Sequence, residues 1–570
     1  MSSTPAAGST PDAPCNVAAA LAQQARAQPD TPAIHYPVGV RRGTVHYDSA
    51  SYAALDALSD RYARGLAAYG ITRGMRVALM VPPGLEFFAL FFALFKAGTV
   101  PVLIDPGIGM RPLRKCLGEA QPEAFIGITR AQLARVLLRW SPASIRRTVT
   151  LGPRLAWGGI TLAGLAARGG DSGPAVLADT RADDMAAILF TSGSTGIPKG
   201  VVYRHRHFAS QVDMLRDTFG IRPGEVDLAT FPPFALFDPA LGMSTVVPCM
   251  DPTRPAKANP AYLVQAIERF GISNLFGSPA LLKVLGEYCE ARALQLPTLR
   301  RVLSAGAAVP AQTVAMMQRA MPDGGLVHTP YGATECLPVA CISSADITPE
   351  RVAATRAGRG TCVGEPVAPN RVAILRLTDA ALEHFSDEDL LATGEIGEII
   401  VHGPTTTDSY WRRDAQTALA KTRDDAGRLW HRMGDAGYVD ETGRLWFCGR
   451  TSQRVQTAEG DLFADQVEAI FNTIEGVERS ALVGVGPPGG QEPVLCLELR
   501  DGRTGQGEEF KRSIEAAVAG LAAQHPGLHR LRRVLFHPGF PVDIRHNSKI
   551  GRGALARWAE ASPGPGGQKA

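Results

Sequence analysis

The sequence has few cysteines and no long apolar run, and each shortage excludes a class of protein. Nine cysteines occur among 570 residues, and none forms a Cys-x-x-Cys pair. This usage argues against structural zinc and for reduced thiols in a cytoplasmic protein. The most apolar stretch, Leu85 to Phe95, carries Glu86 and is shorter than the roughly 20 residues that span a bilayer. We therefore expect a cytoplasmic protein without a transmembrane segment.

The chain also has no large excess of charge of either sign, and the N-terminus lacks the pattern of a secretory signal. The net charge of +4 is spread over the chain without a basic run, so we expect no nucleic-acid partner. Residues 1–14 are small, polar and proline-rich, and residues 562–570 are rich in proline and glycine. We expect both ends to be disordered tails. The length predicts more than one domain between them.

What the sequence does contain is a loop of glycines and hydroxyls directly after the apolar run Ala186 to Phe190, which is typical of a buried strand. From Thr191 to Gly200 it reads Thr-Ser-Gly-Ser-Thr-Gly-Ile-Pro-Lys-Gly, a spacing that differs from a Walker A loop. Its glycines allow a backbone nest for an anion, and its hydroxyls and lysine complement phosphate oxygens. The loop indicates a polyphosphate ligand, and a flexible linker is the alternative. The residues expected to bind phosphate are Thr191, Ser192, Gly193, Ser194, Thr195, Gly196 and Lys199.

Helical and strand patterns alternate on both sides of this loop. Strands are expected at Val77–Val81, Val100–Ile104, Phe125–Ile128, Ile272–Phe276 and Arg301–Leu303. Helices are expected at Leu55–Leu66, Leu85–Ala97, Asn259–Phe270, Pro279–Tyr288 and Pro310–Ala320. Such alternation predicts parallel strands in doubly wound α/β sheets, with ligands outside the carboxyl ends of the strands.

From about Gly394 the pattern changes to short strands of antiparallel type, which we expect at Glu398–Val401 and over Tyr438–Phe447 with a turn at Gly443. A domain boundary is expected near Gly449 and Arg450. The predicted division is a large domain over residues 15–449 and a small α+β domain over residues 450–561. The small domain is expected to contain a strand at Ala481–Val485 and a helix near Phe510–Leu521.

Two stretches of small or mixed polar residues could hold a nucleotide, and the first of them directly follows a predicted strand. Ser304 to Pro310 consists of small side chains, which let a flat ring lie against the backbone, although a tight turn is the alternative. Tyr331 to Glu335 combines an aromatic ring for stacking, a glycine for close approach, a hydroxyl and a carboxylate. Mg²⁺ prefers one or two carboxylates plus substrate phosphates, and a solvated surface acid is the alternative for Glu335.

Two further stretches lie near the predicted domain boundary and the C-terminus. Asp435, in Trp430–Tyr438, is expected in a turn flanked by glycines, where its carboxylate could accept two ribose hydroxyls or merely form the turn. Lys549 lies in Arg545–Ile550. Such a lysine is usually exposed and idle, and it matters only if the small domain folds over the active site.

Taken in this order, the motifs resemble those of the adenylate-forming superfamily of acyl-CoA synthetases, luciferases and nonribosomal adenylation domains, from about Asp30 to Trp558. The resemblance implies a large N-terminal domain with doubly wound sheets and a distorted β-barrel-like subdomain, and a small mobile α+β C-terminal domain. It also implies ATP and Mg²⁺. The resemblance implies that the loop binds the β- and γ-phosphates, that Thr334 contacts the α-phosphate and that Glu335 binds Mg²⁺. Asp435, with Arg450, would hold the ribose, and Lys549 would catalyse adenylation together with Thr334 and Glu335. The residues implied to flank adenine are Ala305, Gly306, Ala307, Tyr331 and Gly332.

The chain departs from this superfamily at the hinge that thioester-forming members use to rotate the small domain. Their motif reads approximately G-R-x-D-x-x-x-K, and here the run from Gly449 to Gln456 has Ser452 in place of the aspartate and Gln456 in place of the lysine. Asp461 takes the place of a usual arginine. The resemblance implies that these positions serve domain alternation and the attack of CoA. The motifs for the adenylation step are unchanged. Drift is the alternative explanation.

Two more motifs narrow the resemblance. The run Phe231 to Gly242 lacks the usual histidine, and Phe234, Phe237 and Gly242 suit a wall for a long acyl chain, or core packing. The C-terminal run Pro541 to Arg552 also departs from most members. Both motifs are similar to those of olefin β-lactone synthetases, which adenylate a 2-alkyl-3-hydroxy fatty acid whose own hydroxyl then closes a lactone ring and releases AMP.

This resemblance leaves several questions open. The alternatives are a long-chain acyl-CoA ligase, an acyl-AMP ligase that feeds a carrier protein, and a non-catalytic nucleotide-binding protein. The resemblance makes a long-chain β-hydroxy acid the expected substrate and other olefin-pathway enzymes candidate partners. No base for the hydroxyl proton is evident, and His205, His207 and His546 are candidates by location only.

Overall fold

The computed structural model of the protein describes residues 12–190, 198–500, 507–542 and 550–562, which belong to two compact units. The first unit comprises Met1–Val339, Val367–Asn370 and His402–Lys421. The second comprises Ala340–Pro366, Arg371–Val401 and Thr422–Ala570. The boundary predicted near Gly449 lies inside the second unit and stays a prediction.

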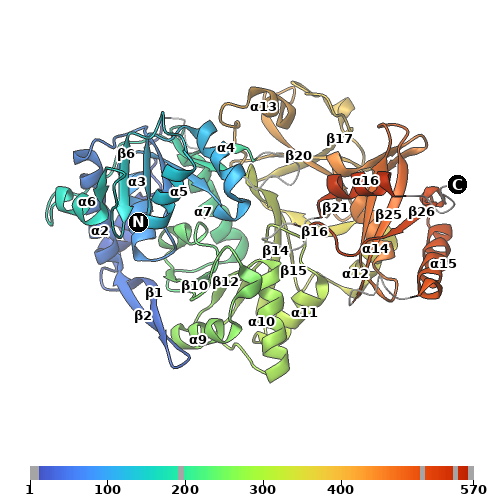
Figure 1. The fold of residues 1–570 in the computed structure, drawn as a ribbon, viewed down its shortest axis with the longest axis horizontal. Helices are drawn as coiled ribbons and strands as arrows, with labels where there is room; N and C mark the ends of the chain where they lie inside the picture. The colour runs from blue at the N-terminus through green and yellow to red at the C-terminus, as the bar shows by residue number, and fades with distance from the viewer. Residues whose placement is uncertain (1–11, 191–197, 501–506, 543–549, 563–570) are drawn as a thin grey trace. The chain divides into compact units, whose positions relative to one another are not determined.

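The first unit contains a seven-stranded sheet in the order β7-β6-β5-β3-β4-β8-β9. Figure 1 labels its strand β6. Its strands are β3 (Arg76–Met80), β4 (Val100–Ile104), β5 (Ala124–Ile128), β6 (Arg147–Leu151), β7 (Ile160–Thr161), β8 (Met185–Phe190) and β9 (Gly200–Arg204). All neighbours are parallel except β8 and β9. The strands predicted before the glycine-rich loop are thereby confirmed, and the loop connects the one antiparallel pair.

A second run of strands in the first unit has the order β14-β13-β12-β10-β11-β1-β2. These strands are β1 (Pro32–Arg41), β2 (Thr44–Ser51), β10 (Val226–Ala229), β11 (Ser244–Val246), β12 (Asn274–Phe276), β13 (Arg301–Leu303) and β14 (Leu326–Ala333). The neighbours from β14 to β1 are parallel, and β2 is antiparallel to β1. Two largely parallel sheets confirm the predicted doubly wound α/β class.

Amphipathic and buried helices connect these strands. They include α2 (Tyr52–Ala68), α3 (Leu85–Lys96), α6 (Leu162–Gly169), α7 (His205–Phe219), α9 (Pro260–Phe270), α10 (Pro279–Arg292) and α11 (Ala311–Ala320). The apolar run of the sequence is α3, a buried helix that packs on α2. At its end Lys96, only 1% exposed, pairs with Asp56 and Asp60 at 2.6 Å each. The two carboxylates compensate the buried ammonium group.

The second unit is built from antiparallel strands followed by an α+β segment. The first group has the order β17-β18-β20-β21-β16, with β16 (Thr361–Pro366), β17 (Arg371–Leu375), β18 (Gly397–His402), β20 (Leu429–Val439) and β21 (Leu445–Arg450). The C-terminal segment comprises β22 (Val455–Thr457), β23 (Gly460–Leu462), α14 (Ala464–Phe471), β24 (Val477–Val485), β25 (Glu492–Leu499), α15 (Glu508–Gln524), β26 (Arg533–Phe536) and α16 (Arg552–Ala561). Strand β24 contains the predicted strand Ala481–Val485, and α15 contains the predicted helix Phe510–Leu521.

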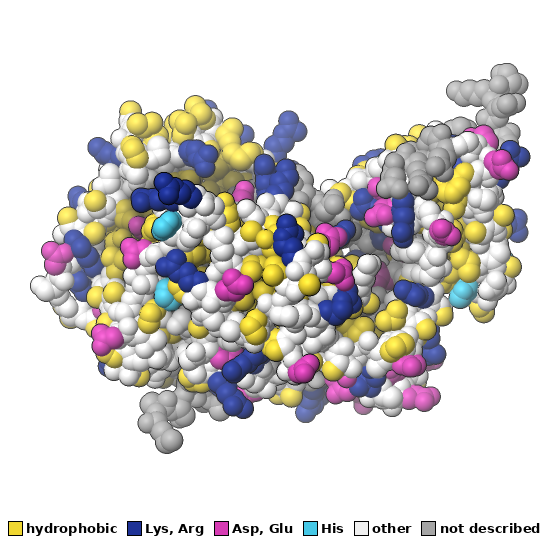
Figure 2. Space-filling view, turned by 90° about the horizontal axis from the view of Figure 1, so that it is seen from below, with side chains coloured by type: hydrophobic (Ala, Val, Ile, Leu, Met, Phe, Trp, Pro, Cys, Tyr) yellow, Lys and Arg dark blue, Asp and Glu magenta, His cyan; other side chains and the backbone are white. Residues whose placement is uncertain are grey.

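Charges of both signs are mixed on the surface that Figure 2 displays. On that face, Lys and Arg side chains are interspersed with Asp and Glu side chains and with apolar ones. Within the described ranges, no helix is both long enough and apolar enough to cross a membrane.

Candidate functional site

The first unit joins two of the sequence motifs through a tyrosine that the motifs do not include. Tyr410 donates its hydroxyl proton to Oε1 of Glu335 at 2.6 Å, and the same hydroxyl accepts from Nζ of Lys199 at 3.1 Å. The ammonium group of Lys199 also lies 4.2 Å from the centre of the Tyr410 ring. The lysine of the predicted phosphate loop and the predicted metal-binding carboxylate are therefore held on one hydroxyl.

The backbone around Tyr410 explains this arrangement. Tyr410 forms an antiparallel bridge with Val201 at the start of β9, and Trp411 N–H donates to the carbonyl of Gly200 at 2.7 Å. Residues 409–411 thus run beside the strand that begins directly after Lys199. Two backbone contacts fix the position from which the tyrosine reaches Glu335.

Glu335 is buried, with 8% of its surface exposed, and the segment 405–421 surrounds it with polar groups. Thr407 donates both its N–H and its hydroxyl to the backbone carbonyl of Glu335, at 2.9 and 3.0 Å. Lys421 is also buried and donates to the hydroxyl of Thr407 at 3.4 Å. Burial lowers the pKa of Lys421 to about 8, against the opposing effect of the Glu335 charge. A buried carboxylate beside lysines has the charge that suits Mg²⁺ and nucleotide phosphates.

Sequence reasoning missed Thr407, Tyr410 and Lys421. A signal was present, because three threonines, an aspartate and a serine precede the Tyr-Trp pair immediately after a predicted strand. The sequence did not indicate which residue these hydroxyls would serve.

The residues predicted to flank adenine lie at the carboxyl ends of adjacent parallel strands. The register pairs Leu303 of β13 with His328 of β14, so Ala305, Gly306 and Ala307 follow one strand while Tyr331 and Gly332 end the next. This is the edge at which doubly wound sheets bind ligands. A Cβ atom on Gly332 would meet the Cys336 carbonyl at 2.8 Å, which explains why a glycine stands there. Thr334 accepts from the Tyr203 hydroxyl on its carbonyl at 2.6 Å.

Asp435 and Arg450 pair in the second unit, but the predicted turn at Asp435 is wrong. Asp435 lies inside strand β20, opposite Arg450 of β21, and the two side chains form an ion pair at 2.8 Å. Gly434 adopts a φ of +66°, and the register shifts between Ala436 and Gly437. The glycines therefore produce an irregular strand instead of a turn. The ion pair fits the expectation that Arg450 assists Asp435, whose role toward ribose stays a prediction.

Several predicted residues lie outside the described part of the chain. They are Thr191, Ser192, Gly193, Ser194, Thr195, Gly196, His546 and Lys549. The chain directly after Lys549 is well anchored. Ile550 bridges Val542, and Arg552 forms a two-pronged ion pair with Glu468 and donates to the Gln453 side chain at 3.0 Å.

The predicted acyl wall is an aromatic cluster. Phe234 stacks on Phe276 with ring centres 4.3 Å apart, and the buried Phe237 lies 5.9 Å from Phe208. These contacts suit either an acyl wall or core packing, so both interpretations remain. Gly242 has a clear structural reason, because its φ of +72° ends a helical turn and a Cβ atom there would lie 2.9 Å from Pro223.

Two of the histidines that are candidates for the base, His205 and His207, lie in the described part of the chain. Both are buried and accept a hydrogen bond from a backbone N–H group. His205 accepts the Val17 N–H on Nδ1 at 3.4 Å, and burial lowers its pKa to about 4. His207 is fully buried and accepts the Arg204 N–H on Nδ1 at 3.0 Å. Burial lowers its pKa to about 3. Both residues lie in the first turn of α7.

The buried imidazole of His207 predicts a pH-dependent loss of stability. The unfolded chain binds a proton at this residue near pH 6.5, whereas the native state resists it down to about pH 3. The free energy of unfolding should therefore fall by up to about 1.4 kcal/mol per pH unit from this residue as the pH drops from about 6.5 to about 4. Urea unfolding of His207→Asn across this range should show a flatter dependence. His46→Asn, at an exposed position on β2, is the control, and an unchanged slope in His207→Asn contradicts the assignment.

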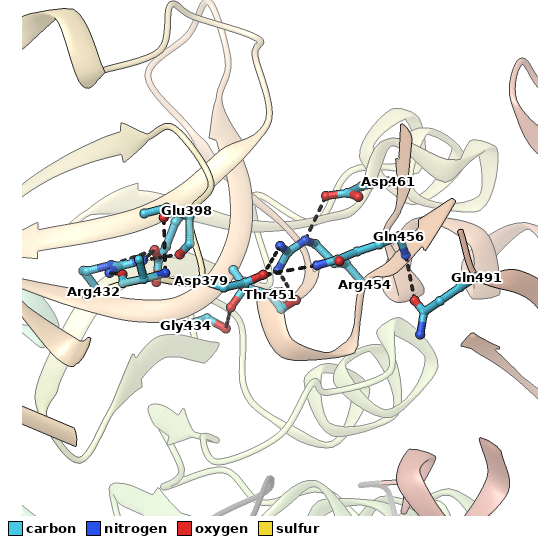
Figure 3. A network of polar contacts seen from close by, with 11 residues as sticks. Asp379, Glu398, Arg432, Gly434, Thr451, Arg454, Gln456, Asp461 and Gln491 are labelled. Atoms are coloured by element: carbon cyan, nitrogen blue, oxygen red, sulfur yellow. Dashed lines mark hydrogen bonds and ion pairs between the residues drawn. The ribbon is translucent and has the colours of Figure 1, made fainter. Parts of the chain in front are cut away.

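Two of the three hinge departures, Gln456 and Asp461, lie in one polar network of the second unit, shown in Figure 3. Arg454 donates to Asp461 at 2.8 Å and forms a two-pronged pair with Asp379 at 2.8 and 2.9 Å. Gln456 also donates to Asp379, at 3.3 Å, and its backbone N–H donates to Gln491 at 2.9 Å. The pairing with Arg454 lowers the pKa of Asp379. Gln456 and Asp461 are therefore linked only indirectly, through the Arg454–Asp379 ion pair.

Comparison with known proteins agrees with these features. A profile of the AMP-binding enzyme family matches residues 21–411. The chain is 56% identical over 551 residues to an olefin beta-lactone synthetase of Xanthomonas campestris, covering 96% of this chain and 97% of that one. A protein of the same name from Stenotrophomonas maltophilia is 55% identical, covering 96% and 98%. The structure of ATP-bound MatB from Rhodopseudomonas palustris has the same fold, with a TM-score of 0.75 at 23% identity over 96% of this chain and 99% of that one. The chain therefore belongs to the AMP-binding enzyme family of ATP-dependent, acid-activating ligases.

Proposed function

We propose that this enzyme adenylates a long-chain 2-alkyl-3-hydroxy fatty acid and that the 3-hydroxyl then closes a β-lactone ring. The products are the lactone, AMP and pyrophosphate. The observation that carries the proposal is the 56% identity, over nearly the whole chain, to a relative named olefin beta-lactone synthetase. The departures at Gln456 and Asp461 from the hinge motif of thioester-forming members support it, because an internal nucleophile needs no CoA attack.

The adenylation step requires positive charge around the α-phosphorus, because an anionic carboxylate must attack a centre surrounded by anionic oxygens. Lys199 and the predicted Lys549 would supply fixed charge, and Glu335 would hold Mg²⁺, which offsets charge on the phosphates. Asp435 would accept the ribose hydroxyls with Arg450 as its partner. The buried surroundings of Glu335 and Lys421 exclude water from this part of the site.

The lactone step gains from the intramolecular position of the hydroxyl. Its oxygen forms a bond to the acyl carbon, the bond to AMP breaks, and the hydroxyl proton leaves to a base. Well-oriented intramolecular groups reach effective concentrations up to about 10⁵–10⁸ M. Cleavage of the mixed anhydride drives closure against ring strain.

Product analysis by mass spectrometry tests the proposal. The enzyme is incubated with ATP, Mg²⁺ and a synthetic 2-alkyl-3-hydroxy acid, with and without CoA. We expect a product lighter than the acid by one water, together with AMP, in both reactions. A CoA thioester as the only product contradicts the proposal and identifies an acyl-CoA ligase. The matching 2-alkyl acid without the hydroxyl is the control and should yield no lactone.

A further inference from the structure

We propose that Tyr410 is a positioning residue that aligns the Glu335 carboxylate for Mg²⁺ and holds Lys199 beside it. This inference rests on the proposed adenylation chemistry of the same site. It assigns a role to a residue seventy-five positions away from Glu335 in the sequence. Tyr410 acts through its neighbours and does not itself enter the reaction.

The contacts give the hydroxyl of Tyr410 two distinct tasks. As a donor to Oε1 of Glu335, at 2.6 Å, it fixes the rotation of the carboxylate about its last bond. As an acceptor from Lys199, at 3.1 Å, it draws the ammonium group to the same place. The hydroxyl has one proton to give and lone pairs to receive, so both contacts are satisfied together.

The surroundings make this alignment rigid. Tyr410 is 4% exposed and Glu335 is 8% exposed, so neither side chain can turn freely into solvent. Thr407 holds the Glu335 backbone from the same segment, and the ring face of Tyr410 attracts Lys199. A metal ligand held by such outer partners binds its metal more tightly than a freely rotating one.

The variant Tyr410→Phe tests the role, because it keeps the ring against Lys199 and removes only the hydroxyl. We expect the Mg²⁺ concentration for half-maximal pyrophosphate release to rise roughly 10- to 100-fold, the range for outer partners of metal ligands. ATP should still raise the melting temperature in EDTA, while the additional rise on adding Mg²⁺ should require the same roughly 10- to 100-fold higher Mg²⁺ concentration. The matched control is Tyr52→Phe, whose buried hydroxyl donates to the Met243 carbonyl at 2.6 Å and which should leave both readouts unchanged.

A double-mutant cycle separates positioning from a general structural effect. If Tyr410 acts through Glu335, adding Tyr410→Phe to Glu335→Gln should change the Mg²⁺ requirement by less than about two-fold. The proposal is overturned if the two substitutions multiply, if Glu335→Gln leaves the Mg²⁺ requirement unchanged, or if Tyr410→Phe loses ATP binding in EDTA. These readouts concern pyrophosphate release and metal binding, so they are independent of whether the final product is a lactone or a thioester.

Discussion

Replacing Lys549 with alanine should slow pyrophosphate release by a factor on the order of 10²–10³, the size of the effect when one group that stabilises a transition state is removed. The carboxylate and the α-phosphate repel each other as they approach, and a lysine charge between them offsets that repulsion most strongly in the transition state. The expected loss is in kcat, with little change in the affinity for ATP.

Lys549 itself lies outside the described residues. The described residues next to it are anchored, because Ile550 bridges Val542 and Arg552 is held by Glu468 and Gln453. Single-turnover release of pyrophosphate measures the effect. Lys283→Ala, on the exposed face of α10, is the control, and an unchanged rate in Lys549→Ala would show that another residue carries the charge.

The second large effect should come from Arg432, whose replacement by methionine should lower the free energy of unfolding by about 3–5 kcal/mol. Its guanidinium contacts Glu398 at 2.6 and 2.8 Å and donates to the carbonyls of Thr378 and Ala380. The two charged side chains are only 4% and 5% exposed. Methionine would fill the space but leave the Glu398 carboxylate buried without its partner.

The Arg432 effect should depend on pH in a defined direction. Burial already raises the pKa of Glu398, and without Arg432 it should rise further. Glu398 then takes up a proton more readily when folded than when unfolded, so the variant should lose stability as the pH rises. Urea unfolding at pH 5.5 and pH 8 measures this. Arg428→Met is the control, because it breaks the ion pair of a 42% exposed arginine with Asp424. It should lower the free energy of unfolding by less than about 1 kcal/mol. An equal cost for the two variants would contradict the account.

The local elements could be predicted because their signals are local. Strand β4 and strand β13 have the predicted bounds, since each is a short apolar run with clear limits. Helix α9 begins at Pro260, directly after an asparagine whose side chain accepts from Ala261 N–H, as the capping signal indicates. The strand around Asp435 was mistaken for a turn, because glycines that form turns also produce irregular strands.

The candidate site could be predicted only where a motif is continuous in the sequence. Lys199 and Glu335 can be proposed from the sequence because each stands in a dense local motif. Tyr410 was missed because its link to both depends on the pairing of residues 409–411 with β9, which no local pattern specifies. The hinge region has the same limit, because its contacts also involve residues distant in the sequence. The changes at Gln456 and Asp461 are visible in the sequence, but the Arg454–Asp379 pair that links them includes a residue far back in the chain.

The most direct measurement of the central claim follows the carboxylate oxygens of the acid. The product reaction is run with a 2-alkyl-3-hydroxy acid that carries ¹⁸O at both carboxylate positions. If the carboxylate is adenylated and the 3-hydroxyl attacks the acyl carbon, one ¹⁸O should appear in AMP and one in the lactone carbonyl. A lactone that retains both labels, with unlabelled AMP, would show that the hydroxyl was activated instead and would contradict the account.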